Sequence, residues 1–240
     1  MGDTSPSFFV YVTNFVDSPV KYKFLIIKLV CLFMSDIKLL VTMKLTIHPQ
    51  AQGLIFDLDG TLVDTMPTHY IAWVNTMKKY GIDFTEEIFY KYAGVPTFKI
   101  VALLNDEFGT KMEPEAVHEE KEQAFLDLIH LISPVKQVAE LAIANFGKLP
   151  MAIGTGGVPD VAQKTLEAVG LEKYFSIIVT SRHVKNFKPA PDTFLRCAEL
   201  MGVEPKFCQV FEDAEAGLQA GRNAGMIVTD VRPYYEKFIA

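Results

Sequence analysis

Short apolar runs alternate with helical patterns from Leu54 onward, which is typical of a parallel sheet covered by helices. Helical patterns separate the runs, for example at 159–169 and 192–201, and each of these two is closed by a glycine. We therefore expect an α/β fold with a Rossmann-like parallel-sheet core and helices on both faces. The expected strands are residues 54–56, 150–153, 176–180, 208–211 and 226–229.

Residues 66–135 interrupt this alternation, because they contain consecutive helical patterns with no strand between them. An insert of this kind between the first and second strands predicts an all-α cap domain at 66–135. The core would then consist of 46–65 and 136–240. The helices expected in the cap are residues 67–80, 85–92, 96–108 and 114–131.

The N-terminal stretch, residues 1–45, has a different composition and is an extension of doubtful origin. Residues 1–42 contain no Ala, Glu, Gln, Arg or His, and Lys28 interrupts their most apolar run. That interruption argues against a membrane span, and no small-residue cleavage site follows the run. A mistaken start of translation, a family-specific extension and a targeting segment all remain open. We favour the first, because Met43 directly precedes a self-sufficient domain start.

Composition limits the classes of function. Half of the 240 residues are hydrophobic, and the net charge is −6, with +1 on residues 1–42 and −7 on the rest. An acidic body of this kind excludes a general attraction for nucleic acid. The cysteines, Cys31, Cys197 and Cys208, show neither a C-x-x-C spacing nor a disulfide pattern. We expect a cytoplasmic enzyme without membrane or nucleic-acid partners, with a monomer as the default state.

The first candidate for chemistry is the segment from Asp57 to Thr61, which follows the first strand. In open parallel sheets ligands bind beyond the carboxyl ends of the strands. Asp57 and Asp59 are two residues apart and point into one pocket, while Gly60 permits a tight turn and Thr61 can hydrogen-bond an oxyanion. One carboxylate can attack phosphorus, and its neighbour can exchange protons with the leaving oxygen and with water.

Two further strand ends carry groups suited to an anion. Thr155 follows the second strand, and its hydroxyl together with the amides of Gly156 and Gly157 can hold phosphate oxygens. Lys188 stands in a proline-framed turn that fixes the position of its ammonium group. Taken singly, the glycine turn is more often structural, and a solvated lysine is an equal alternative.

Glu212 and Asp213 end the fourth strand. Adjacent carboxylates opposite Asp57 suit Mg²⁺, which prefers hard oxygen ligands. Acidic residues near the start of a helix are also ordinary partners of its dipole. The occurrence of all four elements in order favours a phosphoryl-transfer site.

These motifs resemble the haloacid dehalogenase superfamily over about Gln52 to Asp230. The helical insert resembles the cap of the β-phosphoglucomutase-like branch, closest in character to sugar-phosphate phosphatases of the fructose-1-phosphate type. The resemblance implies Asp57 as nucleophile and Asp59 as general acid/base. It also implies Mg²⁺ bound by Asp57, the Asp59 main-chain carbonyl and Asp213, with Glu212 as a ligand or a partner of one. His69 becomes a plausible contact for cap closure or substrate.

The resemblance leaves a phosphatase and a mutase as alternatives. Mutases of this branch bind a second phosphate with an arginine in the cap and a lysine–asparagine pair after the second motif. Here Thr97 occupies the arginine position, with Lys99 two residues away, and Val158 and Pro159 replace the pair. We therefore favour a Mg²⁺-dependent phosphatase that acts on a small phosphorylated metabolite such as a hexose 1-phosphate. A β-phosphoglucomutase is the second hypothesis, and a non-catalytic binder of phosphorylated metabolites is the third.

The remaining histidines and the cap aromatics give weaker indications than the strand-end motifs. His118 and His130 fall in a polar-faced helix and are expected at the surface. Phe98, Tyr90 and Tyr92 are candidates for the substrate cleft, although aromatic residues in helices more often belong to a core.

Overall fold

A computed structural model describes residues 44–92 and 95–235. The interpretation of the first 42 residues therefore lies outside the described part of the chain. No helix in that part combines the length and the apolar character needed to cross a bilayer.

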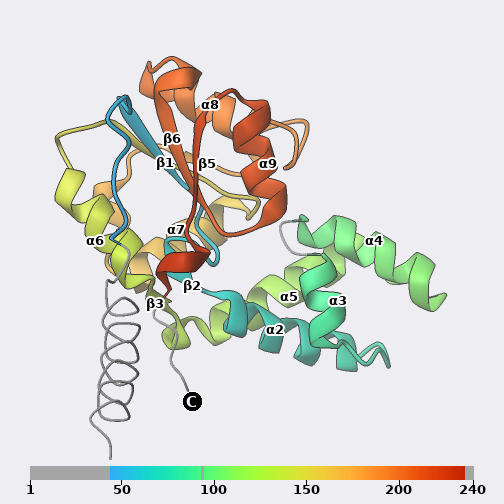
Figure 1. The fold of residues 1–240 in the computed structure, drawn as a ribbon. Coiled ribbons are helices and arrows are strands. Elements are labelled where there is room, and N and C mark those ends of the chain that lie inside the picture. Colours follow the sequence, from blue (N-terminus) through green and yellow to red (C-terminus); the bar gives the residue numbers. More distant parts are fainter. Residues whose placement is uncertain (1–43, 93–94, 236–240) are drawn as a thin grey trace, which may run out of the picture. The chain divides into compact units, whose positions relative to one another are not determined.

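A parallel sheet forms the centre of the core (Figure 1). Its strands are β1 (Gly53–Phe56), β4 (Met151–Gly154), β5 (Ile178–Val179), β6 (Cys208–Glu212) and β7 (Ile227–Asp230). They lie in the order β5-β4-β1-β6-β7, and every pair is parallel. The strand that precedes Asp57 is therefore the central one, which places Asp57 in the middle of the carboxyl edge of the sheet.

Helices cover both faces of this sheet, as the sequence pattern predicts. They are α6 (Lys136–Asn145), α7 (Pro159–Ala168), α8 (Asp192–Met201) and α9 (Glu215–Asn223). Because side chains alternate along a strand, Leu54 and Phe56 pack with α6 and α7 on one face, and Ile55 packs with α8 and α9 on the other. Figure 1 shows the strands between these two pairs of helices. The α/β fold class is confirmed.

Four α-helices between the residues Asp64 and Ser133 make up the segment expected to be the cap, shown in cyan to yellow-green in Figure 1. They are α2 (Met66–Lys78), α3 (Glu86–Lys91), α4 (Thr97–Phe108) and α5 (Pro114–Asp127). They share a hydrophobic cluster of their own, in which Trp73 stacks on Phe84 at a centroid distance of 5.1 Å. The insert therefore has an apolar centre separate from the two that flank the sheet.

Two short strands at the ends of the insert were not predicted. They are β2 (Val63–Asp64) and β3 (Ser133–Pro134), which pair antiparallel. A two-residue strand carries no periodicity from which it could be recognised. The pair joins the chain entering the cap to the chain leaving it.

Two predicted elements are shorter in the structure. The strand expected at 176–180 is reduced to β5, which pairs with β4 alone. The helix expected at 114–131 stops at Asp127, and a separate 3-10 turn covers Ile129–Leu131. Both differences fall at the ends of elements, where periodicity is least informative.

Candidate active site

Asp57 and Asp59 lie just beyond the carboxyl end of β1. Asp57 is 5% exposed, and its backbone N–H donates to the carbonyl oxygen of Phe211 at 3.0 Å. Gly60 turns the chain with a φ of 84°, and a Cβ at this position would lie 2.6 Å from an oxygen of Asp213. Glycine is required here for both reasons, since the turn needs a positive φ and the carboxylate needs the space.

Lys188 connects Asp57 to Glu212. Its Nζ donates to Oδ1 of Asp57 at 2.6 Å and to Oε2 of Glu212 at 2.7 Å. Burial alone would lower the pKa of Lys188, but the two carboxylates raise it above its ordinary value. Burial raises the pKa of Asp57, and Lys188 opposes that shift. The ammonium group thus stays charged at the floor of the site.

Asp213 completes a cluster with Asp57 and Glu212, in which one oxygen from each lies within 4.8 Å of the others. Thr61 Oγ1 donates to Asp213 Oδ1 at 2.8 Å. Burial, reinforced by the charge of Asp57, raises the pKa of Asp213 to about 7 and that of Glu212 to about 8. Such pKa values mean that the cluster holds more negative charge than Lys188 can balance.

The donor set of this cluster fits Mg²⁺. Carboxylate oxygens are the hard ligands that this ion prefers, and a divalent cation would remove the excess negative charge. Both oxygens of Glu212 already accept hydrogen bonds, one from Lys188 and one from the backbone N–H of Ala214 at 3.1 Å. Asp57 and Asp213 are therefore better placed than Glu212 to bind an ion directly.

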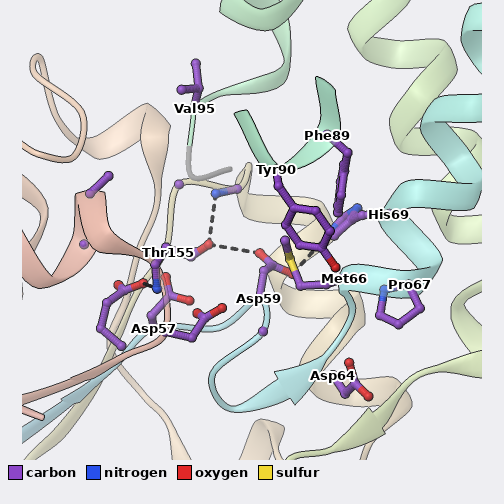
Figure 2. A pocket seen from close by; sticks show the side chains of 18 of the residues that line it. Asp57, Asp59, Asp64, Met66, Pro67, His69, Phe89, Tyr90, Val95 and Thr155 are labelled. Carbon is purple, nitrogen blue, oxygen red and sulfur yellow. Dashed lines mark hydrogen bonds and ion pairs between the residues drawn. The ribbon is translucent and has the colours of Figure 1, made fainter. Parts of the chain in front are cut away.

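Thr155 reaches the site from the end of β4, in the chain segment expected to bind phosphate. Its Oγ1 donates to Oδ2 of Asp59 at 3.3 Å and accepts the backbone N–H of Gly157 at 2.9 Å (Figure 2). Gly156 lines the same pocket. Parallel pairing of β1 with β4 brings the two loops together, although they are almost one hundred residues apart in the sequence.

Asp59 is also bound from the cap side. Oδ1 of Asp59 accepts a hydrogen bond from Thr65 Oγ1 at 2.9 Å. The same oxygen lies 3.2 Å from Nε2 of His69, a residue of α2 (Figure 2). Burial raises the pKa of Asp59, but His69 and Thr65 lower it more, and the result is a pKa of about 2. The structure thus brings His69, singled out from the sequence, directly to Asp59.

Lys121, on α5, was not predicted to belong to the site. Its side chain is 4% exposed, and its Nζ lies 2.9 Å from Nδ1 of His69 and 3.1 Å from Oε1 of Glu122. Glu122 also accepts Thr97 Oγ1 at 2.8 Å. Lys121 has Val117 four residues before it and Phe125 four residues after it, both buried. This helical stripe of apolar residues was the sequence signal for a buried lysine.

The expectation that His118 lies at the surface is wrong. It is 6% exposed, its Nδ1 lies 3.7 Å from Glu122 Oε1, and burial lowers its pKa. The polar composition of α5 concealed that His118 and Lys121 are buried and that Glu122 lines the pocket. His130 is exposed, as expected.

A pocket lies between the carboxyl edge of the sheet and the cap. It includes every residue predicted to bind substrate or metal except Thr61, which is fully buried beneath Asp213. Of the three aromatic candidates for the cleft, Tyr90 and Tyr92 line the pocket, whereas Phe98 does not and instead packs against Phe187. Lys99 lies over the Phe187 ring at 4.4 Å and is not part of the lining.

The sequence profile of haloacid dehalogenase-like hydrolases matches residues 54–231. The chain is 42% identical to the fructose-1-phosphate phosphatase YqaB of Escherichia coli, over 75% of this chain and 96% of YqaB. It is 32% identical to a phosphorylated carbohydrates phosphatase of Thermotoga maritima, over 73% of this chain and 82% of that protein.

The fold is likewise similar to solved structures. A β-phosphoglucomutase of Clostridium difficile superposes with a TM-score of 0.67 at 28% identity, covering 75% of this chain and 84% of that one. The profile match and the identity to YqaB show that the chain belongs to the family of haloacid dehalogenase-like hydrolases.

Proposed function

We propose that this hydrolase is a Mg²⁺-dependent phosphatase that acts on small phosphorylated sugars through an aspartyl-phosphate at Asp57. The observation that carries the proposal is the position of Asp57, whose carboxylate meets Lys188 at 2.6 Å on the floor of the pocket. The similarity to two phosphatases of phosphorylated carbohydrates supports the substrate class.

In the first step an oxygen of Asp57 attacks phosphorus, and the bond from phosphorus to the substrate oxygen breaks. That oxygen takes a proton from Asp59, and the phosphoryl group stays on Asp57. In the second step a water oxygen attacks phosphorus and gives a proton to Asp59, and the Asp57–phosphorus bond breaks. Free phosphate leaves, and both carboxyl groups return to their starting states.

Lys188 and the groups of the Thr155 loop would neutralise the charge on the phosphoryl oxygens during both steps. Asp57 and Asp213 would hold Mg²⁺, together with the main-chain carbonyl of Asp59, and the ion would supply further positive charge at the transferring group. Glu212 would orient Lys188, since both of its oxygens are already bound within the core.

Because the pKa of Asp59 is low, the bound substrate has to raise it before Asp59 can act as an acid. A carboxyl group with a pKa of about 2 is ionised at neutral pH and has no proton to give. A phosphate dianion placed beside it disfavours the ionised form, because like charges raise the pKa of an acid. Binding of substrate would therefore prepare Asp59 for its role as the acid.

The Asp57→Asn variant tests the proposal. We expect wild-type protein to release phosphate from hexose 1-phosphates with Mg²⁺ and to lose this activity in EDTA. Removal of the nucleophile should lower the rate at least ~10³-fold, a typical cost for a group that forms the covalent intermediate. Full activity in Asp57→Asn would refute the assignment of Asp57 as nucleophile. If the wild-type protein releases no phosphate from a wide panel of phosphomonoesters, a non-catalytic binding protein is favoured.

A mutase is the second candidate, since the fold and sequence are similar to β-phosphoglucomutases. It needs cationic groups for a second phosphate. Within the described residues, both lysines of helices α2–α5 that line the pocket are paired with carboxylates: Lys91 with Glu107 and Lys121 with Glu122. Formation of glucose 6-phosphate from glucose 1-phosphate faster than the release of phosphate would decide for the mutase.

A further inference from the structure

Glu122 is a largely buried carboxylate in the wall of the pocket that the cap provides. Its side chain is 14% exposed, and it lines the pocket beside Thr97 and Lys121. The side chain is therefore accessible from the pocket. Thr97, Lys121 and His118 each contact Oε1 of this carboxylate.

The position of Glu122 relative to the reacting groups follows from a chain of contacts. Asp59 meets Nε2 of His69, Nδ1 of the same ring meets Lys121, and Lys121 meets Glu122. Glu122 therefore lies along the cap wall, beyond the side chain that faces the substrate's bridging oxygen. Asp57 and Glu122 line the same pocket, so a substrate whose phosphate lies at Asp57 can extend its remaining atoms towards Glu122.

The charge of this wall decides what it can bind. Lys121 and Glu122 neutralise each other at 3.1 Å, and Thr97 adds only a hydroxyl group. Burial raises the pKa of Glu122, but Lys121, His69 and Thr97 lower it below its ordinary value, so the carboxylate stays ionised. A carboxylate accepts hydroxyl hydrogens strongly, whereas it repels a phosphate group in a partly dehydrated pocket.

We propose that Glu122 and Thr97 form a subsite that accepts the hydroxyl groups of the substrate's sugar or polyol and rejects a second phosphate. The inference rests on the proposed phosphatase function, because it assumes that the phosphate lies at Asp57. Glu122 would determine specificity in two ways, by accepting hydrogen bonds from substrate hydroxyl groups and by repelling a second phosphate group.

The first test removes the acceptor. In Glu122→Ala, we expect kcat/KM for a hexose 1-phosphate to fall at least ~10-fold relative to kcat/KM for phenyl phosphate, since a hydrogen bond to a charged group contributes about 1.5–3 kcal/mol. Phenyl phosphate shares the chemical steps but has no hydroxyl groups. Glu119→Ala, an exposed position on the same helix, is the matched control and should leave this ratio unchanged.

The second test removes only the charge. In Glu122→Gln, which keeps the size of the side chain, we expect a hexose 1,6-bisphosphate to bind about tenfold more tightly relative to the hexose 1-phosphate. Binding is measured by calorimetry in the Asp57→Asn background, so that this readout does not depend on turnover. Glu119→Gln in the same background serves as the control, and thermal unfolding checks that each variant is folded.

The outcomes separate the subsite from the function. An equal fall for both substrates in Glu122→Ala would show that Glu122 acts through Lys121 and His69 on Asp59, and the proposal would be wrong. An unchanged preference between monophosphate and bisphosphate in Glu122→Gln would also overturn it. If the wild type releases no phosphate from any ester, the phosphatase function fails, while calorimetry still reports whether the subsite discriminates.

Discussion

Phe187 packs edge-on against Phe98 of the cap helix α4, with ring centroids 6.0 Å apart. Phe187 directly precedes Lys188 in the chain, and Lys99 of the same cap helix lies 4.4 Å above the Phe187 ring. The loop that carries the lysine at Asp57 is therefore in contact with the cap. The position of the cap and the position of Lys188 are mechanically connected.

Substitution of Phe187 by alanine should disturb catalysis more than stability. The side chain is only half-buried, so we expect the free energy of unfolding to fall by about 1–2 kcal/mol. We expect kcat/KM for phenyl phosphate to fall about tenfold, because small displacements of a positioned charge are costly. Phe146→Ala is the control, since Phe146 forms a similar edge-on pair with Tyr174 but is not adjacent to Lys188 in the chain. Equal kinetics in the two variants would contradict a connection between cap and lysine.

Binding of Mg²⁺ should depend on pH through Asp213. Its folded-state pKa of about 7 exceeds the unfolded value of about 3.9, so between these values the folded state retains a proton that the unfolded state has lost. Stability of the metal-free protein therefore falls as the pH rises through this window. Mg²⁺ replaces that proton, so we expect it to raise the melting temperature more at about pH 8 than at about pH 5.5.

Thermal unfolding with and without Mg²⁺ measures this effect. At a Mg²⁺ concentration near 100 times the dissociation constant, the gain is about 2.7 kcal/mol, or roughly 5–10 °C for a chain of this size. Asp213→Asn should remove most of the increase. A shift that is the same at both pH values, or one that survives in Asp213→Asn, would show that the ion binds elsewhere.

Gly217 should not tolerate alanine. It lies in the first turn of α9, and a Cβ there would be 2.1 Å from the carboxylate of Glu212. At an ordinary helical position glycine to alanine stabilises by up to about 1 kcal/mol. Here the clash must move Glu212 or the helix, and we expect a loss of about 2–3 kcal/mol in unfolding free energy. Chemical denaturation gives the sign directly, and a stabilised Gly217→Ala variant would mean that the contact is not as close as described.

His69→Asn tests what sets the proton affinity of Asp59. His69 is the largest of the influences that lower the pKa of Asp59, whereas burial raises it. Without His69 the pKa of Asp59 should rise from about 2 by at least one unit. We expect the alkaline limb of the kcat–pH profile, where Asp59 loses the proton that it needs as general acid, to move upward by a similar amount. Tyr70→Phe, a neighbouring position on α2, should leave the limb where it is in the wild type.

The core and the residues at its strand ends could be predicted because both depend on local patterns. Runs such as 208–211 are short, apolar and bounded by turn residues, and the parallel sheet then brings Asp57 and Lys188 to one edge. The cap face of the site could not be predicted in this way. Lys121, Glu122 and His118 lie on a helix whose composition is typical of a solvated surface, and only the packing of α5 against α2 and α4 buries them.

The carboxylates of Asp57 and Asp59 are separated by a single residue, but their side-chain partners come from different parts of the molecule. Asp57 takes its side-chain partner, Lys188, from the sheet and its loops, whereas Asp59 is bound by Thr155 from the core and by His69 from the inserted helices. Changes in the insert can therefore retune proton transfer and substrate choice together while the phosphoryl acceptor stays intact. A descendant of this protein could change its preferred metabolite by altering helices α2–α5 alone, with the ancestral attacking group inherited unchanged.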